Sequence, residues 1–156
     1  MADLIVLDSL HSTQISLSSI MDGSGGLSAR RQIMLDRVPE IGDSAVFKHK
    51  TLELIDLAYL TAKTGHEFAI LRGKDTDILF HGDSTHCEIQ ETLAVMLKAH
   101  KLELVGHSHP GEDDPIPSST DRATLKIIGQ KKSFVISGRS GRIVEFGQSL
   151  FEDYML

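Results

Sequence analysis

From about residue 44 onward, apolar residues recur alternately at helical and at strand spacing, and this alternation limits the possible folds of the chain more than any other feature. Segments with apolar residues three or four positions apart alternate with short runs typical of strands, and glycine or proline often separates them. The helical segments are 51–64, 90–101 and 118–129, and the strand segments are 45–48, 67–72, 76–80, 102–109, 133–137 and 142–146. Helices that alternate with strands predict an α/β fold, a mixed sheet flanked by helices.

The N-terminal quarter of the chain does not share this pattern. We expect residues 1–20 to form short strands or an extended arm, followed by a flexible linker at 22–26, an Asp-Gly-Ser-Gly-Gly run. We therefore divide the chain into an N-terminal arm or extension of unknown role, 1–43, and a main domain, 44–156. We expect the main domain to fold without residues 1–26.

The charge balance and the single cysteine exclude several classes of protein. The 156 residues include 16 Lys and Arg against 22 Asp and Glu, a formal net charge of -6. The pairs Arg30-Arg31 and Lys131-Lys132 are too short to form a surface that follows a phosphate backbone, so no nucleic-acid partner is expected. Cys87 has no disulfide partner, the first residues lack the cationic segment of a signal peptide, and no apolar run reaches the length of a membrane span. We expect a cytoplasmic protein with no membrane association.

A histidine pair and a following carboxylate carry the most specific chemistry in the sequence. His107 and His109 are two positions apart in a predicted strand, so both imidazoles point to the same side. Asp121 lies in the first turn of the helix that follows Pro110 and a short acidic loop. Two nitrogens and one oxygen leave the fourth position of a zinc tetrahedron open for water, which is typical of a catalytic rather than a structural zinc site.

Simpler interpretations of these residues are also open. The chain has eight histidines, so a His-x-His pair can arise by chance. Ser118-x-x-Asp121 also fits a capping box at the start of a helix, and this role is compatible with metal binding because a capped first turn would hold Asp121 in place. Glu67, at the start of another predicted strand, is by itself better explained as a partly buried carboxylate paired with a neighbour such as His66.

The histidine pair, the loop and the carboxylate together resemble the motif of the JAMM or MPN-plus metallopeptidases, which carry His-x-His-Pro, a short loop and Ser-x-x-Asp. Residues 114–121, Asp-Pro-Ile-Pro-Ser-Ser-Thr-Asp, are especially similar to the prokaryotic and RadC-type branch of this JAB-domain family. The family also has a glutamate that opens an upstream strand, and Glu67-Phe-Ala-Ile-Leu-Arg-Gly73 matches it directly after a predicted helix. The resemblance covers about residues 44–148 and implies a JAMM/MPN-like, cytidine-deaminase-like mixed sheet flanked by helices.

The resemblance also implies a role for each of five residues. His107, His109 and Asp121 would hold one Zn²⁺ ion per chain. Glu67 would act as general base and then as general acid, taking a proton from the zinc-activated water and passing it to the leaving amine. Ser118 would donate a hydrogen bond to the oxyanion of the tetrahedral intermediate.

The loop before the aspartate departs from the family pattern. The usual interval from the second histidine to the aspartate is one residue shorter than here, and alignment on residues 115–118 places the extra residue within 111–114. A loop absorbs one residue at little entropic cost, so we keep Asp121 as the ligand. Asp113 and Asp114 are expected to be solvated loop charges, with replacement of Asp121 by either of them as the alternative.

The function implied by the resemblance is hydrolysis of an amide or isopeptide bond by a zinc metalloprotease with deubiquitinase-like chemistry. The substrate would be a protein or peptide, with a ubiquitin-like tail as one candidate. The chain between Gly73 and Gln90 is short, which is similar to bacterial or phage-associated members rather than to relatives with long ubiquitin-docking insertions. Two alternatives are a non-catalytic MPN-type protein-binding module and a RadC-type role near DNA, which the acidic charge disfavours.

Overall fold

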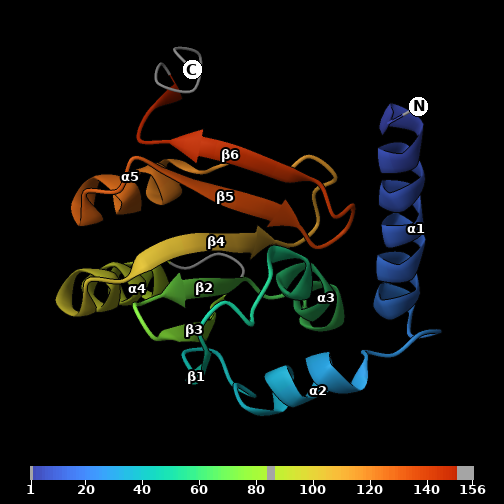
Figure 1. Cartoon of the computed structure of the whole chain (residues 1–156), viewed down its shortest axis with the longest axis horizontal. Helices are drawn as coiled ribbons and strands as arrows, with labels where there is room; N and C mark the ends of the chain where they lie inside the picture. The colour runs from blue at the N-terminus through green and yellow to red at the C-terminus, as the bar shows by residue number, and fades with distance from the viewer. Residues whose placement is uncertain (1, 84–86, 151–156) are drawn as a thin grey trace.

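A computed structural model of the chain describes residues 2–83 and 87–150, with side chains described over 10–83 and 93–150 (Figure 1). These residues form five helices and six strands. The helices are α1 (Ala2–Asp22), α2 (Ala29–Asp36), α3 (Leu54–Thr64), α4 (Cys87–His100) and α5 (Ser119–Ile128). The strands are β1 (Ser44–Lys48), β2 (Phe68–Arg72), β3 (Thr76–His81), β4 (Glu103–His109), β5 (Lys132–Ser137) and β6 (Ile143–Gly147). None of these five helices has the length and apolar character needed to cross a membrane.

The strands form one mixed sheet in the order β1-β3-β2-β4-β5-β6. Neighbouring strands are antiparallel except β4 and β5, which are parallel. A parallel pair needs a crossover connection, and α5 supplies it between β4 and β5. The predicted α/β fold with a mixed sheet flanked by helices is therefore confirmed.

Each face of the sheet is covered by its own helices. Phe68 and Ile70 of β2 belong to a core cluster with residues of α1, α2 and α3. Ala69 and Leu71, which alternate with them along β2, belong to a second cluster with residues of α4 and α5. Figure 1 shows α4 and α5 at the left of the view, α3 nearer its middle, α2 at the bottom and α1 at the right. The sheet is the middle layer of three, so a side chain on one face meets only one set of helices.

The first residues of the chain form a helix and not an arm. Helix α1 packs on α3, and Leu17 and Ile20 are 0% and 5% exposed. A Cβ atom at Gly141 would lie 2.7 Å from the methyl group of Thr13, so α1 also lies against the turn between β5 and β6. The prediction of short strands or an extended arm for 1–20 is wrong. The apolar residues of this segment follow helical spacing, but the serines between them have a low helix propensity and weaken the helical pattern.

The segment predicted to be a flexible linker, 22–26, forms a hydrogen-bonded turn. The N–H of Gly25 donates to the carbonyl of Ser19 at 2.9 Å. Beyond this turn, Met34 and Val38 are 2% and 0% exposed and belong to the core cluster on the α3 face of the sheet. The division of the chain at residue 43 stays a prediction, and residues on both sides of it share this core.

A buried carboxylate ties α2 to α3. Asp56 is 0% exposed and accepts hydrogen bonds from Arg30 at 2.6 Å, from Arg31 at 3.0 Å and from the backbone N–H of Glu53 at 2.9 Å. Burial alone would raise the pKa of Asp56, but the hydrogen bonds and the charge of Arg30 outweigh it and hold the pKa below its ordinary value. A carboxyl group with a lowered folded-state pKa stabilises the fold above its unfolded pKa, and this contribution is lost as the pH falls.

We expect Asp56→Asn to lower the free energy of unfolding at pH 7 by about 1–3 kcal/mol, as for other hydrogen bonds to charged groups. The difference in the free energy of unfolding between variant and wild type should shrink below about pH 4. As the pH falls, the carboxyl group becomes protonated in the unfolded chain before it does so in the folded chain, and its contribution to stability is lost. Urea unfolding at pH 7 and pH 3 measures both values. The exposed Asp36 of α2 is the control, since Asp36→Asn should change stability by less than about 0.5 kcal/mol. Equal losses in the two variants would contradict the anchoring role of Asp56.

A β-bulge interrupts β4 just before the histidine pair. Strands β2 and β4 pair Leu71 with Leu104 and then Ile70 with Gly106, so Val105 is an extra residue in β4. A bulge of this kind shifts the alternation of side chains between the two faces of a sheet.

The shift decides on which face of the sheet the histidines lie. Leu104, before the bulge, belongs to the core cluster on the α4 and α5 face. After the bulge His107 is paired with Ala69, a residue of the same cluster, so His107 and His109 also lie on this face. Strict alternation from Leu104 would have placed both histidines on the α3 face.

Candidate metal centre

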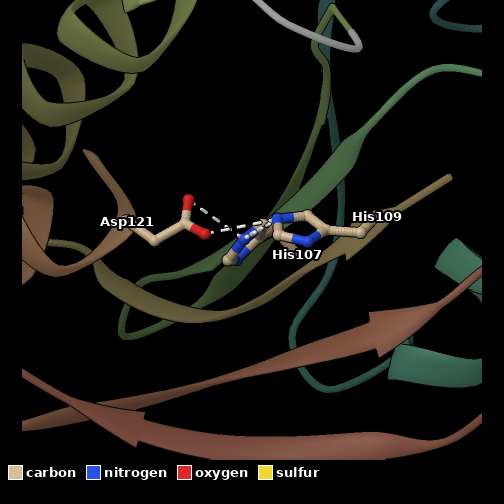
Figure 2. Close-up of side chains that lie close together, drawn as sticks. All are labelled: His107, His109 and Asp121. Carbon is tan, nitrogen blue, oxygen red and sulfur yellow. Dashed lines mark hydrogen bonds and ion pairs between the residues drawn. The ribbon is translucent and has the colours of Figure 1, made fainter. Parts of the chain in front are cut away.

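The three residues predicted to bind metal lie together beside the end of β4. His107 and His109 point toward α5, and Asp121 in the first turn of α5 points back toward both rings (Figure 2). The three residues are 5%, 9% and 4% exposed. Within the part of the chain that the structure describes, they are the one group of three histidine, cysteine or acidic side chains whose ligand atoms converge closely enough for a metal ion. This group could hold such an ion.

The ligand atoms of the three residues lie close together. The Nε2 atoms of His107 and His109 are 3.1 Å apart. Oδ1 of Asp121 lies 3.2 Å from Nε2 of His107, and Oδ2 lies 3.2 Å from Nε2 of His109. Around zinc, with bonds of about 2.0–2.1 Å, neighbouring tetrahedral ligand atoms are about 3.3 Å apart. A different carboxylate oxygen faces each imidazole, and the donor set and these short separations are compatible with a bound zinc ion.

The start of α5 holds the Asp121 carboxylate in place. The backbone N–H of Ser118 donates to Oδ2 of Asp121 at 2.9 Å, and the N–H of Asp121 donates to Oγ of Ser118 at 3.0 Å. The predicted capping box is confirmed, and it coexists with the position of Asp121 beside the histidines. The Ser118 hydroxyl accepts in the cap, so its own proton remains available for donation.

The charges at the site favour a cation. Burial alone would raise the pKa of Asp121, but the charge of His107, hydrogen bonds from both rings and the Ser118 N–H lower this pKa far below its ordinary value. Burial likewise lowers the pKa of His109, and the nearby carboxylates of Asp121 and Glu67 outweigh it and raise that pKa. A carboxylate with a lowered pKa and two imidazole nitrogens form a donor set that suits a divalent transition metal.

Packing orients the ring of His107. The ring meets Phe146 of β6 edge to face, with centroids 5.8 Å apart and ring planes at 86°. Metal-ligating histidines usually donate their second N–H to a carboxylate or carbonyl, but Nδ1 of His107 is buried without a hydrogen-bond partner among the described residues. Phe146 thus helps to limit rotation of this ring, and the sequence pattern does not indicate this contact.

The predicted proton shuttle lies beside the same group. Glu67 directly precedes β2, and its Oε1 atom lies 3.3 Å from Nε2 of His109, with the side chain 16% exposed. The structure thus brings four predicted residues into contact around one point, and Ser118 adjoins them through Asp121. The ring of His66, the alternative partner of Glu67, lies with its Nδ1 atom 2.8 Å from Nε2 of His81.

The acidic loop between the ligands is held by the hairpin of β5 and β6. Two serine hydroxyls of the hairpin donate to backbone carbonyls of the loop. Asp113 pairs with Arg139 at 3.3 Å, and Asp114 pairs with Arg142 at 2.6 Å. Both carboxylates are mostly exposed and point to arginines, so the structure does not support either of them as a replacement for Asp121. The longer loop is accommodated by these contacts at the protein surface.

Comparison of the chain with protein-family models, curated proteins and solved structures found no match. The arrangement of the described side chains is therefore the basis on which a function can be proposed.

Proposed function

We propose that this protein is a zinc-dependent metallohydrolase that cleaves an amide or isopeptide bond, with JAMM-like chemistry. The observation that carries the proposal is the convergence of His107, His109 and Asp121 at 3.1–3.2 Å, with the Glu67 carboxylate 3.3 Å from one of the rings. Three protein ligands leave one position of a zinc tetrahedron open, and a carboxylate next to such a position is suited to proton transfer. A structural zinc site would need a fourth protein ligand and no neighbouring base.

The residues divide into ligands and reacting groups. His107, His109 and Asp121 would hold the metal, and zinc in such a site lowers the pKa of water to about 7. Glu67 accepts the proton of the attacking water and passes it to the leaving amine, as general base and then general acid. The hydroxyl of Ser118, whose proton is not used in the cap, donates to the oxyanion of the tetrahedral intermediate.

The fold supports the same proposal at a coarser level. A mixed sheet with helices on both faces is compatible with the JAMM/MPN-like, cytidine-deaminase-like architecture that the sequence motifs imply. The site lies at the end of β4, where the chain leaves the sheet. A protein or peptide substrate, such as a ubiquitin-like tail, remains the proposed substrate class. The formal charge of -6 disfavours the RadC-type role near DNA.

A non-catalytic binding module is the second candidate, and metal analysis separates it from the enzyme. We expect protein purified without chelator to contain about one zinc ion per chain, because three converging ligands are present. His107→Ala and His109→Ala should each lose most of the zinc, since two remaining ligands bind weakly. Elemental analysis measures the zinc content, and the exposed His100 supplies the control variant His100→Ala, which should keep wild-type zinc. Wild-type protein that neither contains zinc nor takes it up when zinc is added would contradict the enzyme proposal.

A further inference from the structure

The residue between the two histidines has its side chain on the other face of the sheet. Ser108 is 0% exposed, and its hydroxyl lies among α3 and β2 rather than at the metal centre. The backbone N–H of Phe68 donates to Oγ of Ser108 at 2.9 Å. Oγ of Ser108 lies 2.5 Å from Oγ1 of Thr61 on α3, and Thr61 in turn donates to the carbonyl of His66 at 2.8 Å. These groups form a continuous chain of hydrogen bonds from β2, through β4 and α3, back to the residue before Glu67.

The direction of each bond follows from the number of protons. A hydroxyl carries one proton, and Thr61 uses its proton on the carbonyl of His66. Ser108 therefore donates to Thr61, while it accepts from the N–H of Phe68. The alternative acceptor for Ser108, the carbonyl of Phe68, is 3.3 Å away, which is long for a hydroxyl donor. Both hydroxyl groups are thus satisfied, and each has one defined donor and acceptor.

The chain of bonds encloses Glu67. Its two ends are the carbonyl immediately before Glu67 and the N–H immediately after it. The carbonyl of Glu67 itself accepts from the N–H of Gly82 of the loop after β3 at 2.7 Å. The backbone pairing of β2 with β4 ends at Ala69 and His107, so beyond this point the Ser108 hydroxyl joins the two strands.

We propose that Ser108 and Thr61 are positioning residues that fix the Glu67 carboxylate relative to His107 and His109. The inference rests on the proposed function, since the two hydroxyl groups are assigned the role of positioning the proposed proton shuttle, Glu67. Neither hydroxyl touches the metal centre, because both lie on the opposite face of the sheet. Ser108 nevertheless shares its backbone with both ligands, so a shift of the Glu67 backbone relative to the ligands strains the bonds of this pair. Errors of about 1 Å in the placement of reacting groups can slow an enzyme by about 10²-fold.

Thr61 offers a matched pair of substitutions. Its methyl group lies directly over Gly138, where a side chain would collide with it. Thr61→Val keeps this methyl contact and removes the hydroxyl, whereas Thr61→Ser keeps the hydroxyl and removes the methyl. We expect Thr61→Val to lower kcat by about 10-fold with KM and zinc affinity within about 3-fold of wild type. Thr61→Ser should restore kcat to within about 3-fold.

A second buried hydroxyl controls for a general loss of stability. Ser133 of β5 is 1% exposed and donates to the carbonyl of Leu104 at 2.8 Å, which also joins two strands but away from Glu67. Ser133→Ala should leave kcat within about 2-fold of wild type. If Thr61→Val does not fold, Ser108→Ala removes the middle of the same chain of bonds and takes its place. Equal turnover in Thr61→Val and Ser133→Ala would overturn the proposal, as would a loss of zinc affinity as large as the loss of kcat.

A readout without turnover separates this inference from the proposed function. The carbon-13 NMR signal of the Glu67 carboxyl and the exchange rate of the Phe68 amide are measured in metal-free and in zinc-loaded protein. Thr61→Val and Ser108→Ala should shift the carboxyl signal and speed exchange of the amide, and Ser133→Ala should change neither. Wild-type protein that binds zinc and cleaves no amide would defeat the proposed function alone, because these signals still report the positioning. Unchanged signals in Thr61→Val and Ser108→Ala would overturn the positioning role itself.

Discussion

Glu67→Gln should slow amide hydrolysis by about 10²–10⁴-fold while zinc content stays close to that of the wild-type protein. Glutamine keeps the shape of the side chain and its capacity to form hydrogen bonds, but an amide cannot accept the proton of the attacking water. His107, His109 and Asp121 are unchanged, so the ligand set is intact. Turnover of a fluorogenic amide of a ubiquitin-like tail, together with elemental analysis of the same samples, measures both quantities.

Asp121→Asn is the informative comparison, because this substitution should weaken zinc binding directly, whereas Glu67→Gln should slow only the proton transfer. A neutral amide is a poorer ligand for a divalent cation than a carboxylate, so zinc retention should weaken. The comparison is needed because Glu67 lies 3.3 Å from Nε2 of His109, almost as close as Asp121 does at 3.2 Å. Loss of zinc from Glu67→Gln as readily as from Asp121→Asn would make Glu67 a fourth ligand. Wild-type turnover in Glu67→Gln would require another group as the base.

Leu17→Ala should lower the free energy of unfolding by about 2–5 kcal/mol, the usual cost of truncating a fully buried leucine. Leu17 is 0% exposed and belongs to the core cluster on the α3 face of the sheet. Because small domains are stable by only about 5–15 kcal/mol, this loss is a large share of the total. Deletion of residues 1–26 would remove Leu17 and the buried Ile20 together, so the shortened chain should be less stable still.

Ile15, two residues away on the same helix, is the matched control. It is 58% exposed, so Ile15→Ala should change stability by less than about 0.5 kcal/mol. Urea unfolding of the two variants and of the shortened chain measures the three values. If Leu17→Ala is no more destabilising than Ile15→Ala, helix α1 does not belong to the core in solution, and the expectation that residues 1–26 are dispensable would stand.

The parts of the fold that the sequence predicts are those controlled by local pattern. The spacing of apolar residues from residue 44 onward locates three helices and six strands, because period and turn residues act over a few positions. The same applies to the capping box of Ser118 and Asp121, which needs only one helical turn. The convergence of His107 and His109 follows from strand alternation alone.

The parts that could not be predicted depend on contacts between distant segments. Helix α1 is stabilised mainly by its packing on α3 and on the turn at Gly141. Its sequence is rich in serine, so the helical pattern of the sequence itself is weak. The contact of Phe146 with His107 needs the order of strands in the sheet. The hydroxyl pair of Ser108 and Thr61 requires α3 to lie over β4, which no spacing within either segment indicates.

The bulge at Val105 makes the metal site depend on how β4 pairs with β2 upstream of the histidines. If β4 paired without the bulge, with Val105 opposite Ile70 and Gly106 opposite Ala69, Ser108 would face α5 and both imidazoles would turn toward α3. Every ligand and the whole of both motifs would still be present in the sequence. The motifs alone therefore do not decide on which face of the sheet the ligands lie, and a relative that retains them has the same site only where its strand pairing also places the first histidine opposite the counterpart of Ala69.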